Sequence, residues 1–202
     1  MKKLITVFLI TISCNVFAQS SGTFKDNRDG QVYKWVRIGS QIWMAENLNY
    51  NPGRGSGQRG YEYGRIYDWD TAQKVCPNGW HLPTDDEWLE LERYLGLSNS
   101  NDQNYRQYDW TGGKQLKSKT GWQPYMQNGN GIDSYGFAAL PGGFYQTYTR
   151  KFMYYGTGIT FWTATEADSK NAVVRELGSH YDGINRSELY KVHGAYCRCV
   201  KD

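Results

Sequence analysis

The chain carries little net charge and, beyond its first residues, no long apolar run. It contains 23 basic and 20 acidic residues among 202, which gives a formal net charge of +3. This balance offers nucleic acid no strong electrostatic attraction. A membrane-spanning helix needs roughly 20 apolar residues in a row. We therefore expect no nucleic-acid partner and no transmembrane span in the mature chain, whose length suits one domain with a hydrophobic core.

The sequence also lacks the usual motifs of catalytic and metal sites. Its three histidines, His81, His180 and His193, show no short spacing typical of zinc ligands. There is no Ser-His-acid arrangement and no phosphate-binding glycine loop. Calcium requires six or more oxygen ligands, and most residues of the oxygen-rich clusters have simpler roles at helix starts or in turns. These clusters are Asp68, Asp70, Asp85, Asp86 and Glu87, and Asp26, Asn27 and Asp29. We predict no catalytic residue, no metal and no cofactor, and calcium bound at one of these clusters is the alternative that stays open.

The first eighteen residues have the pattern of a cleavable export signal. In order, they contain a basic start at 2–3, an apolar run at 4–12 and a small-residue cleavage site at 16–18. Cleavage would make Gln19 the first residue and remove two lysines, leaving 21 basic against 20 acidic residues. Lipidation of Cys14 is the alternative, but Thr11 stands where a larger aliphatic residue usually precedes a lipidated cysteine. We expect a secreted or cell-envelope protein.

Three cysteines remain after cleavage: Cys76, Cys197 and Cys199. Export implies an oxidising compartment, in which disulfides form. A Cys197–Cys199 bond is disfavoured because residues two apart on a strand lie near or beyond the usual Cα limit of about 6.8 Å. A bond from Cys76 to the end of the chain would close a long loop and stabilise the fold by roughly 3–5 kcal/mol. One thiol is left over.

Local patterns predict a hairpin near the start of the mature chain. Residues 31–38 alternate apolar and polar side chains, Gly39 and Ser40 form a two-residue turn, and residues 41–44 resume the strand pattern. Residues 51–64 follow with five glycines among polar residues, which predicts a surface loop.

Two helices are predicted next. Asp70 can cap a short helix that stops before Pro77. Thr84 and Glu87 form a capping box at the start of a second helix, which Gly96 can end. The apolar residues that share one helical face are Trp69, Ala72 and Val75 in the first helix and Trp88, Leu91 and Leu95 in the second.

The rest of the chain is predicted to be loops and strands. Residues 98–130 indicate an ordered loop with short strands, anchored by Trp110, Leu116 and Trp122. Strands are predicted at 137–140, 160–164, 172–177 and 195–200. Two helices followed by a late cluster of strands indicate an α+β fold.

Five segments carry a resemblance to a known family. They are residues 38–50 (IGSQIWMAENLNY), 76–84 (CPNGWHLPT), 135–143 (YGFAALPGG), 161–165 (FWTAT) and 198–202 (RCVKD). Together they resemble the Fibrobacter succinogenes major paralogous domain. This divides the chain into a signal peptide at 1–18, a short N-terminal segment at 19–25 and the domain at 26–202.

The resemblance implies a compact α+β domain with two short helices, short antiparallel strands and long ordered loops. The family resembles the formylglycine-generating (sulfatase-modifying) enzymes and, more remotely, C-type lectins, in which an early helix is tied to the last strand. The resemblance therefore implies a Cys76–Cys199 disulfide, which we adopt as the predicted bridge. Cys197 departs from the family pattern. The family also implies an exported protein of Bacteroidota or Fibrobacterota.

Two activities of those related proteins find little support in the residues. A copper-binding oxidase would need a pair of reactive cysteines upstream of the terminal Arg-Cys segment, and no cysteine lies between Trp162 and His193. Cys197 and Cys199 could imitate such a pair, but Cys199 matches the family's cysteine that forms the implied disulfide with Cys76. The calcium-binding lectin sequences Glu-Pro-Asn and Trp-Asn-Asp are absent.

Aromatic side chains in polar loops favour a binding function. Large amphipathic rings give contact area at modest entropic cost. The candidate ligand-binding residues are Tyr145, Tyr148, Tyr154 and Tyr155, while Trp110 and Trp122 are expected to fill the core. We predict a non-catalytic surface or secreted module that binds a glycan or a cell-envelope protein. A divergent enzyme related to the formylglycine-generating oxidases is the alternative.

Overall fold

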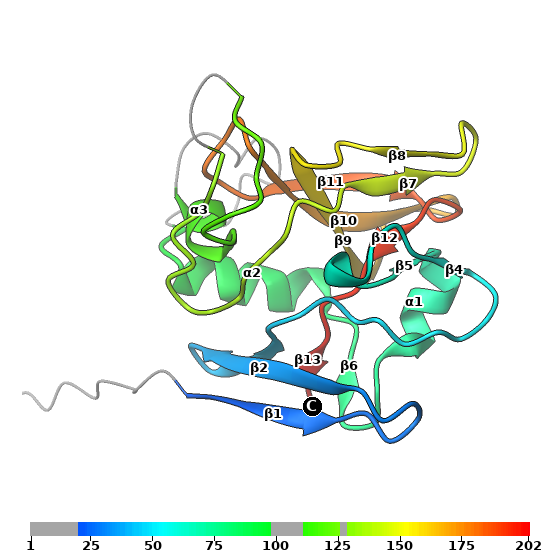
Figure 1. Cartoon of the computed structure of the whole chain (residues 1–202), viewed down its shortest axis with the longest axis horizontal. Coiled ribbons are helices and arrows are strands. Elements are labelled where there is room, and N and C mark those ends of the chain that lie inside the picture. Colours follow the sequence, from blue (N-terminus) through cyan, green and yellow to red (C-terminus); the bar gives the residue numbers. More distant parts are fainter. Residues whose placement is uncertain (1–19, 98–110, 126–128) are drawn as a thin grey trace, which may run out of the picture.

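The structure, a computed structural model, describes residues 20–97, 111–125 and 129–202. The described strands form two large sheets and a separate hairpin (Figure 1). The orders are β1-β2-β3-β13-β6 in the first sheet, β11-β10-β9-β12-β5-β4 in the second, and β7-β8 in the hairpin. Neighbours are antiparallel except for the parallel pair β9 and β12. With few helices and mostly antiparallel strands, the domain is α+β, as predicted.

The first sheet contains the predicted hairpin. Its strands are β1 (Ser21–Lys25), β2 (Val32–Ile38), β3 (Gln41–Met44), β6 (Trp80–His81) and β13 (Val200–Lys201). The β2–β3 register places Ile38 opposite Gln41, so Gly39 and Ser40 form the predicted two-residue turn. Most of the N-terminal segment 19–25 is strand β1, which pairs with β2 and therefore extends the same sheet.

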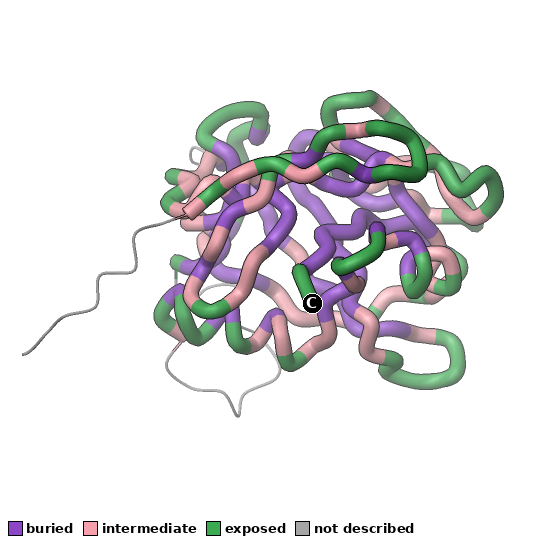
Figure 2. The backbone as a smooth tube through the Cα atoms, turned by 90° about the horizontal axis from the view of Figure 1, so that it is seen from below, coloured by how far each residue is buried: buried purple, intermediate pink, exposed green. Residues whose placement is uncertain are grey.

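The second sheet confirms the two long late strands. It consists of β4 (Ser56–Gly57), β5 (Ile66–Tyr67), β9 (Gly158–Glu166), β10 (Asn171–Gly178), β11 (Asn185–Tyr190) and β12 (Ala195–Tyr196). Neighbouring side chains of β9 point to opposite faces. Phe161 packs in a cluster with Trp88, whereas Trp162 packs in a second cluster with Ala72. Figure 2 shows that buried segments lie in the interior and that exposed segments lie mostly at the periphery.

The helices begin at well-defined caps. Helix α1 (Trp69–Val75) is capped by Asp68, whose carboxylate accepts a hydrogen bond from the Thr71 backbone N–H at 2.9 Å. The prediction of Asp70 as the cap was wrong by two residues, since Asp70 lies in the first turn. Helix α2 (Asp85–Tyr94) has the predicted capping box: Thr84 Oγ1 accepts from Glu87 N at 3.2 Å, and Glu87 Oε2 accepts from Thr84 N at 2.7 Å.

Two predictions in the middle of the chain were wrong. Within 98–130, residues Gly112–Leu116 form a short helix, α3, where we predicted loop and short strands. Phe137–Leu140 is not a strand: Ala138 has a positive φ of 51°, and the Ala139 N–H donates to Leu116 O at 2.9 Å. The predicted anchors Leu116 and Trp122 are buried, whereas Trp110 lies outside the described residues.

The predicted strand 195–200 is instead two strands in different sheets. β12 belongs to the second sheet and β13 to the first, so the chain crosses between the sheets through residues 197–199. The crossing is held by Leu48 N, which donates to Cys197 O, and by Met44 N, which donates to Cys199 O. Cys199 also forms the predicted disulfide with Cys76, with Cα atoms 6.0 Å apart.

The segment 51–64 is more ordered than a plain surface loop. It contains β4 and a short 3-10 helix at Tyr61–Tyr63. β4 pairs with β5 and so forms the edge of the second sheet. Figure 1 shows this edge on the same side of the molecule as the tip of the β7–β8 hairpin (β7 Phe144–Gln146, β8 Lys151–Met153).

Candidate functional site

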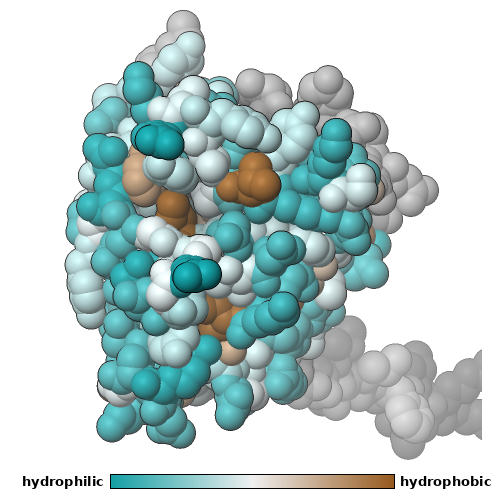
Figure 3. Space-filling model, turned by 90° about the vertical axis from the view of Figure 1, so that its right-hand side faces the viewer, coloured by the Kyte–Doolittle hydropathy of each residue, from teal (hydrophilic) through white to brown (hydrophobic). Residues whose placement is uncertain are grey.

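A cavity of about 420 Å³ lies between the β4–β5 edge, the β7–β8 hairpin and the turn before β12. We call it the hairpin cavity. Residues that line it include Gln58, Ile66, Asp68, Tyr145, Phe152 and His193. Figure 3 shows the side of the molecule that carries the hairpin, where a few hydrophobic residues lie among mostly hydrophilic ones.

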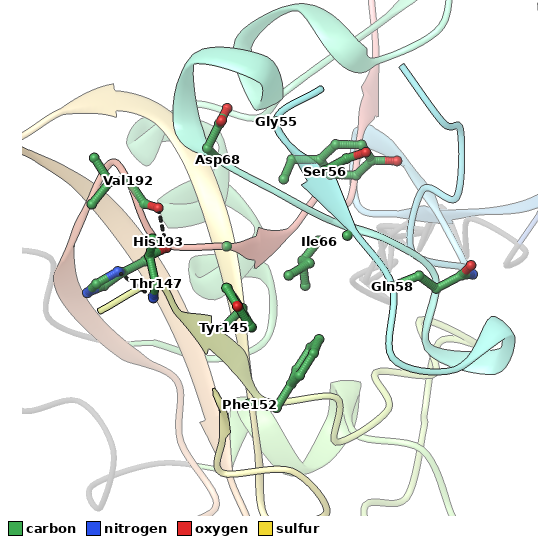
Figure 4. A pocket seen from close by; sticks show the side chains of 13 residues that line it. Gly55, Ser56, Gln58, Ile66, Asp68, Tyr145, Thr147, Phe152, Val192 and His193 are labelled. Atoms are coloured by element: carbon green, nitrogen blue, oxygen red, sulfur yellow. Dashed lines mark hydrogen bonds between the residues drawn. The ribbon is translucent and has the colours of Figure 1, made fainter. Parts of the chain in front are cut away.

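The aromatic wall of the hairpin cavity follows from the strand register. Tyr145 and Phe152 are directly opposite in the antiparallel β7–β8 pair, so their side chains point to the same face. Their ring centroids are 5.4 Å apart, in an edge-to-face arrangement. Figure 4 shows both rings near Ile66. The β7–β8 hairpin therefore supplies two adjacent rings beside an aliphatic residue.

The hairpin is fixed to the body of the domain through its backbone. Tyr145 N donates to Gly194 O at 2.7 Å, and Gly194 N donates to Tyr145 O at 2.9 Å. A side chain at residue 194 would collide with Ile66, because a Cβ there would lie 2.7 Å from the Ile66 Cδ1 atom. Thr147 Oγ1 adds a hydrogen bond to Val192 O at 2.6 Å. The aromatic wall is therefore held in place before any ligand arrives.

Polar groups complete the lining. Thr147 N donates to His193 Nδ1 at 3.3 Å, which makes Nδ1 an acceptor and leaves the ring proton on Nε2. Burial lowers the pKa of His193, so its ring is neutral at neutral pH. Gln58 Nε2 donates to Asn49 Oδ1 at 2.8 Å, and Asp68 uses one carboxylate oxygen to cap α1. The cavity thus combines neutral hydrogen-bonding groups with a single carboxylate.

The four predicted tyrosines take different positions. Tyr145 lines the hairpin cavity, and Tyr148 is 73% exposed with its ring 5.2 Å from that of His193. Tyr155 is engaged within the protein, because its hydroxyl donates to the Tyr63 hydroxyl at 3.2 Å. Tyr154 is exposed and lines a different cavity.

Two residues of the site were missed at the level of sequence. Phe152 lies next to a cation–π contact, with the Arg59 guanidinium 5.5 Å from its ring and 3.7 Å from the Tyr155 ring. Residues 147–150 (Thr-Tyr-Thr-Arg) contain no strong turn former, so no local signal pairs Tyr145 with Phe152. His193 has no local signal either, since the fold brings it to the cavity from 46 residues beyond Thr147.

Some of the residues considered for other chemistry have structural roles. Cys199 is in the disulfide, and burial raises the pKa of the Cys197 thiol, which disfavours a reactive thiolate. The Asp26 carboxylate pairs with Arg28 at 2.6 Å. In the parts of the chain that the structure describes, no group of three or more His, Cys, Asp or Glu residues could hold a metal ion.

These features define an α+β domain with a disulfide-linked C-terminal crossing and an aromatic-lined surface cavity. Residues 36–201 match the Fibrobacter succinogenes major domain, and the chain belongs to that family. Neither a search of curated proteins nor a search of solved structures found a match. Among the helices in the described ranges, none is long and apolar enough to cross a membrane.

Proposed function

We propose that this chain is an exported, non-catalytic module that binds a glycan in the hairpin cavity. The observation that carries the proposal is the pair of rings, Tyr145 and Phe152, facing a cavity that also contains hydrogen-bonding groups. A sugar ring has C–H groups on its faces, which pack on aromatic rings, and hydroxyls at its edge, which need donors and acceptors. A concave site with both features suits such a ligand.

The charge of the lining favours a neutral sugar. Asp68 and His193 are its ionisable residues apart from tyrosine, and His193 is neutral at neutral pH. A carboxylate accepts hydrogen bonds from sugar hydroxyls but repels an anionic group. We therefore favour a glycan over an acidic protein surface, and binding to a protein is an alternative outcome of the test.

The proposal includes a C-type-lectin-like fold related to the sulfatase-modifying enzymes, and export to the cell envelope or beyond. The disulfide that joins the end of α1 to the residue before β13 supports the fold assignment, because it ties an early helix to the last strand. The signal pattern of residues 1–18 supports export, and a disulfide suits an oxidising compartment. Mass spectrometry of the native protein tests the location, since a lipid on Cys14 would replace simple cleavage.

The binding test uses two variants that act differently on the hairpin cavity. Phe152→Ala removes one ring, and Val192→Trp places a large side chain at a lining position that is 53% exposed. A glycan array identifies a ligand, and calorimetry then measures its affinity. We expect each variant to weaken binding by at least about tenfold, as for a central contact residue. Val192→Trp removes no core contact, so it remains informative if Phe152→Ala lowers the melting temperature.

The matched control is Tyr61→Ala, which removes an aromatic ring that is 74% exposed and does not line the hairpin cavity. It should leave affinity unchanged. Wild-type affinity in both cavity variants, or capture of envelope proteins with no glycan bound, would contradict the proposal.

A further inference from the structure

A second cavity, of about 610 Å³, lies where β9 begins and β10 ends. We call it the strand-end cavity. Its lining includes Tyr154, Thr160, Glu176, Tyr181 and Asn185. Like the hairpin cavity, it combines aromatic rings with polar side chains. Nothing in the family match or in the function proposed above assigns it a role.

Three neighbouring strands supply a row of polar side chains to the strand-end cavity. Thr160 on β9 is opposite Glu176 on β10, which in turn is opposite Asn185 on β11. Asn185 Nδ2 donates to Glu176 Oε2 at 2.7 Å. Side chains directly opposite in a sheet share one face, so a hydroxyl, a carboxylate and a carboxamide stand side by side. Glu176 and Asn185 are half-buried and can exchange hydrogen bonds with adjacent sugar hydroxyls, whereas Thr160 is buried.

Tyr154 presents its ring at this cavity from an unfavourable backbone conformation. Its φ is +54°, in the left-handed region that an aromatic residue rarely adopts, and the residue is 63% exposed. The conformation is held by its own carbonyl, which accepts hydrogen bonds from Thr157 N and Gly158 N. Such strain is commonly found where a side chain serves a binding function.

One buried ring packs beside a residue of each cavity. Phe144, at the base of the hairpin, lies with its ring 6.0 Å from that of Tyr154 and 6.2 Å from that of His193. Tyr154 lines the strand-end cavity and His193 the hairpin cavity. Along the chain, Phe152 and Tyr154 are two residues apart and serve different cavities. Residues 144–154 therefore contribute side chains to both cavities or to the core between their lining residues.

The two linings also match in charge. The hairpin cavity has one carboxylate, Asp68, and the strand-end cavity has one, Glu176. Neither set of described lining residues includes a lysine or arginine. Anionic polymers need cationic partners, so both linings suit an uncharged ligand.

We propose that a single neutral, extended glycan chain occupies both cavities and passes over the base of the β7–β8 hairpin between them. This deepens the function proposed above and rests on it. The length of the glycan then determines its affinity, because a short oligosaccharide fills only one cavity. A longer one also contacts the Tyr154 ring and the Glu176–Asn185 pair within the same binding event.

The test measures affinity against chain length. Neutral cello-, xylo- and manno-oligosaccharides of one to six units are titrated by calorimetry into the wild-type chain and into Tyr154→Gly. Glycine accepts a positive φ freely, so this variant removes the ring and relieves the strain. We expect wild-type affinity to rise with length. In Tyr154→Gly the longest ligand should bind about tenfold more weakly, the effect of one lost ring contact, while the shortest ligand that binds keeps its affinity.

The outcomes separate this inference from the function on which it rests. Equal affinity for short and long ligands, two independent sites, or an unchanged length dependence in Tyr154→Gly would overturn the single extended ligand but leave glycan binding intact. Tighter binding of polygalacturonate or heparin than of the neutral series would overturn the neutral class. Failure of every glycan to bind would overturn both proposals.

Discussion

His81 is held between two carboxylates from distant parts of the chain. Its Nδ1 is 2.6 Å from Asp202 Oδ1, and its Nε2 is 2.7 Å from Glu87 Oε1. A neutral imidazole has one N–H and could donate to only one of them. Partial burial by itself lowers the pKa of His81, but hydrogen bonds to Asp202 and Glu87 outweigh burial and raise the pKa. The charged ring connects the start of α2 to the C-terminal residue.

Stability should depend on pH through this residue. A histidine whose pKa is raised on folding contributes stability that is fully present below its unfolded pKa, about 6.5, and is lost as pH rises through the folded pKa. We expect His81→Gln to be less stable than wild type at pH 5.5 and the difference to shrink by pH 9. Urea unfolding of both proteins at the two pH values measures it. A difference that grows with pH would refute the ion-pair role.

At the scale of elements, α2 depends on its N-terminal cap. Thr84 and Glu87 satisfy each other's backbone N–H groups, and Thr84→Ala removes one half of this exchange. We expect a loss of about 1 kcal/mol in the free energy of unfolding, with Thr84→Ser as the control that keeps the hydroxyl. Denaturant unfolding at constant pH measures both. If Thr84→Ser and Thr84→Ala lower the free energy of unfolding equally, the loss comes from the packing of the threonine methyl group and not from the cap.

The elements that could be predicted from sequence are those specified by local chemistry. The β2–β3 hairpin has its turn residues, α2 its capping box, and β9 and β10 their apolar runs. Helix α3 could not be predicted, because its Gly-Gly start has low helix propensity. Its position depends on distant contacts: Lys114 N donates to Asp182 O at 2.8 Å, and a Cβ at Gly113 would lie 1.9 Å from Gly183 O.

The sequence revealed the aromatic content of the candidate sites but not their grouping. Tyr145 and Tyr154 are nine positions apart in one tyrosine-rich stretch, yet they line different cavities. What separates them is the β7–β8 register and the positive φ of Tyr154. Neither feature follows from residue type, since tyrosine and arginine rarely adopt the left-handed conformation found at Tyr154 and Arg150.

At the scale of the whole molecule, the crossing between β12 and β13 joins the two sheets. The family motif at residues 198–202 includes part of this crossing, but the sequence pattern predicted one continuous strand at 195–200. Arg198 lies within the crossing, 1% exposed, and hydrogen-bonds Asn47 Oδ1 and the carbonyls of Met44 and Phe137. Burial lowers the pKa of Arg198 to about 9. These side-chain contacts hold residue 198 between the sheets, and the backbone carbonyls of Cys197 and Cys199 accept from Leu48 N and Met44 N.

The disulfide should therefore contribute to the stability of the entire domain. Cys76 and Cys199 are 123 positions apart, so their bond restricts most of the unfolded chain. In the chain-entropy account, we expect Cys76→Ser/Cys199→Ser to lower the free energy of unfolding by roughly 3–5 kcal/mol. The control is Cys197→Ala, which keeps the bond and removes a buried thiol at a cost of about 1 kcal/mol. Denaturant unfolding compares them, and a double variant as stable as Cys197→Ala would show that the packed crossing holds the sheets together without the covalent bond.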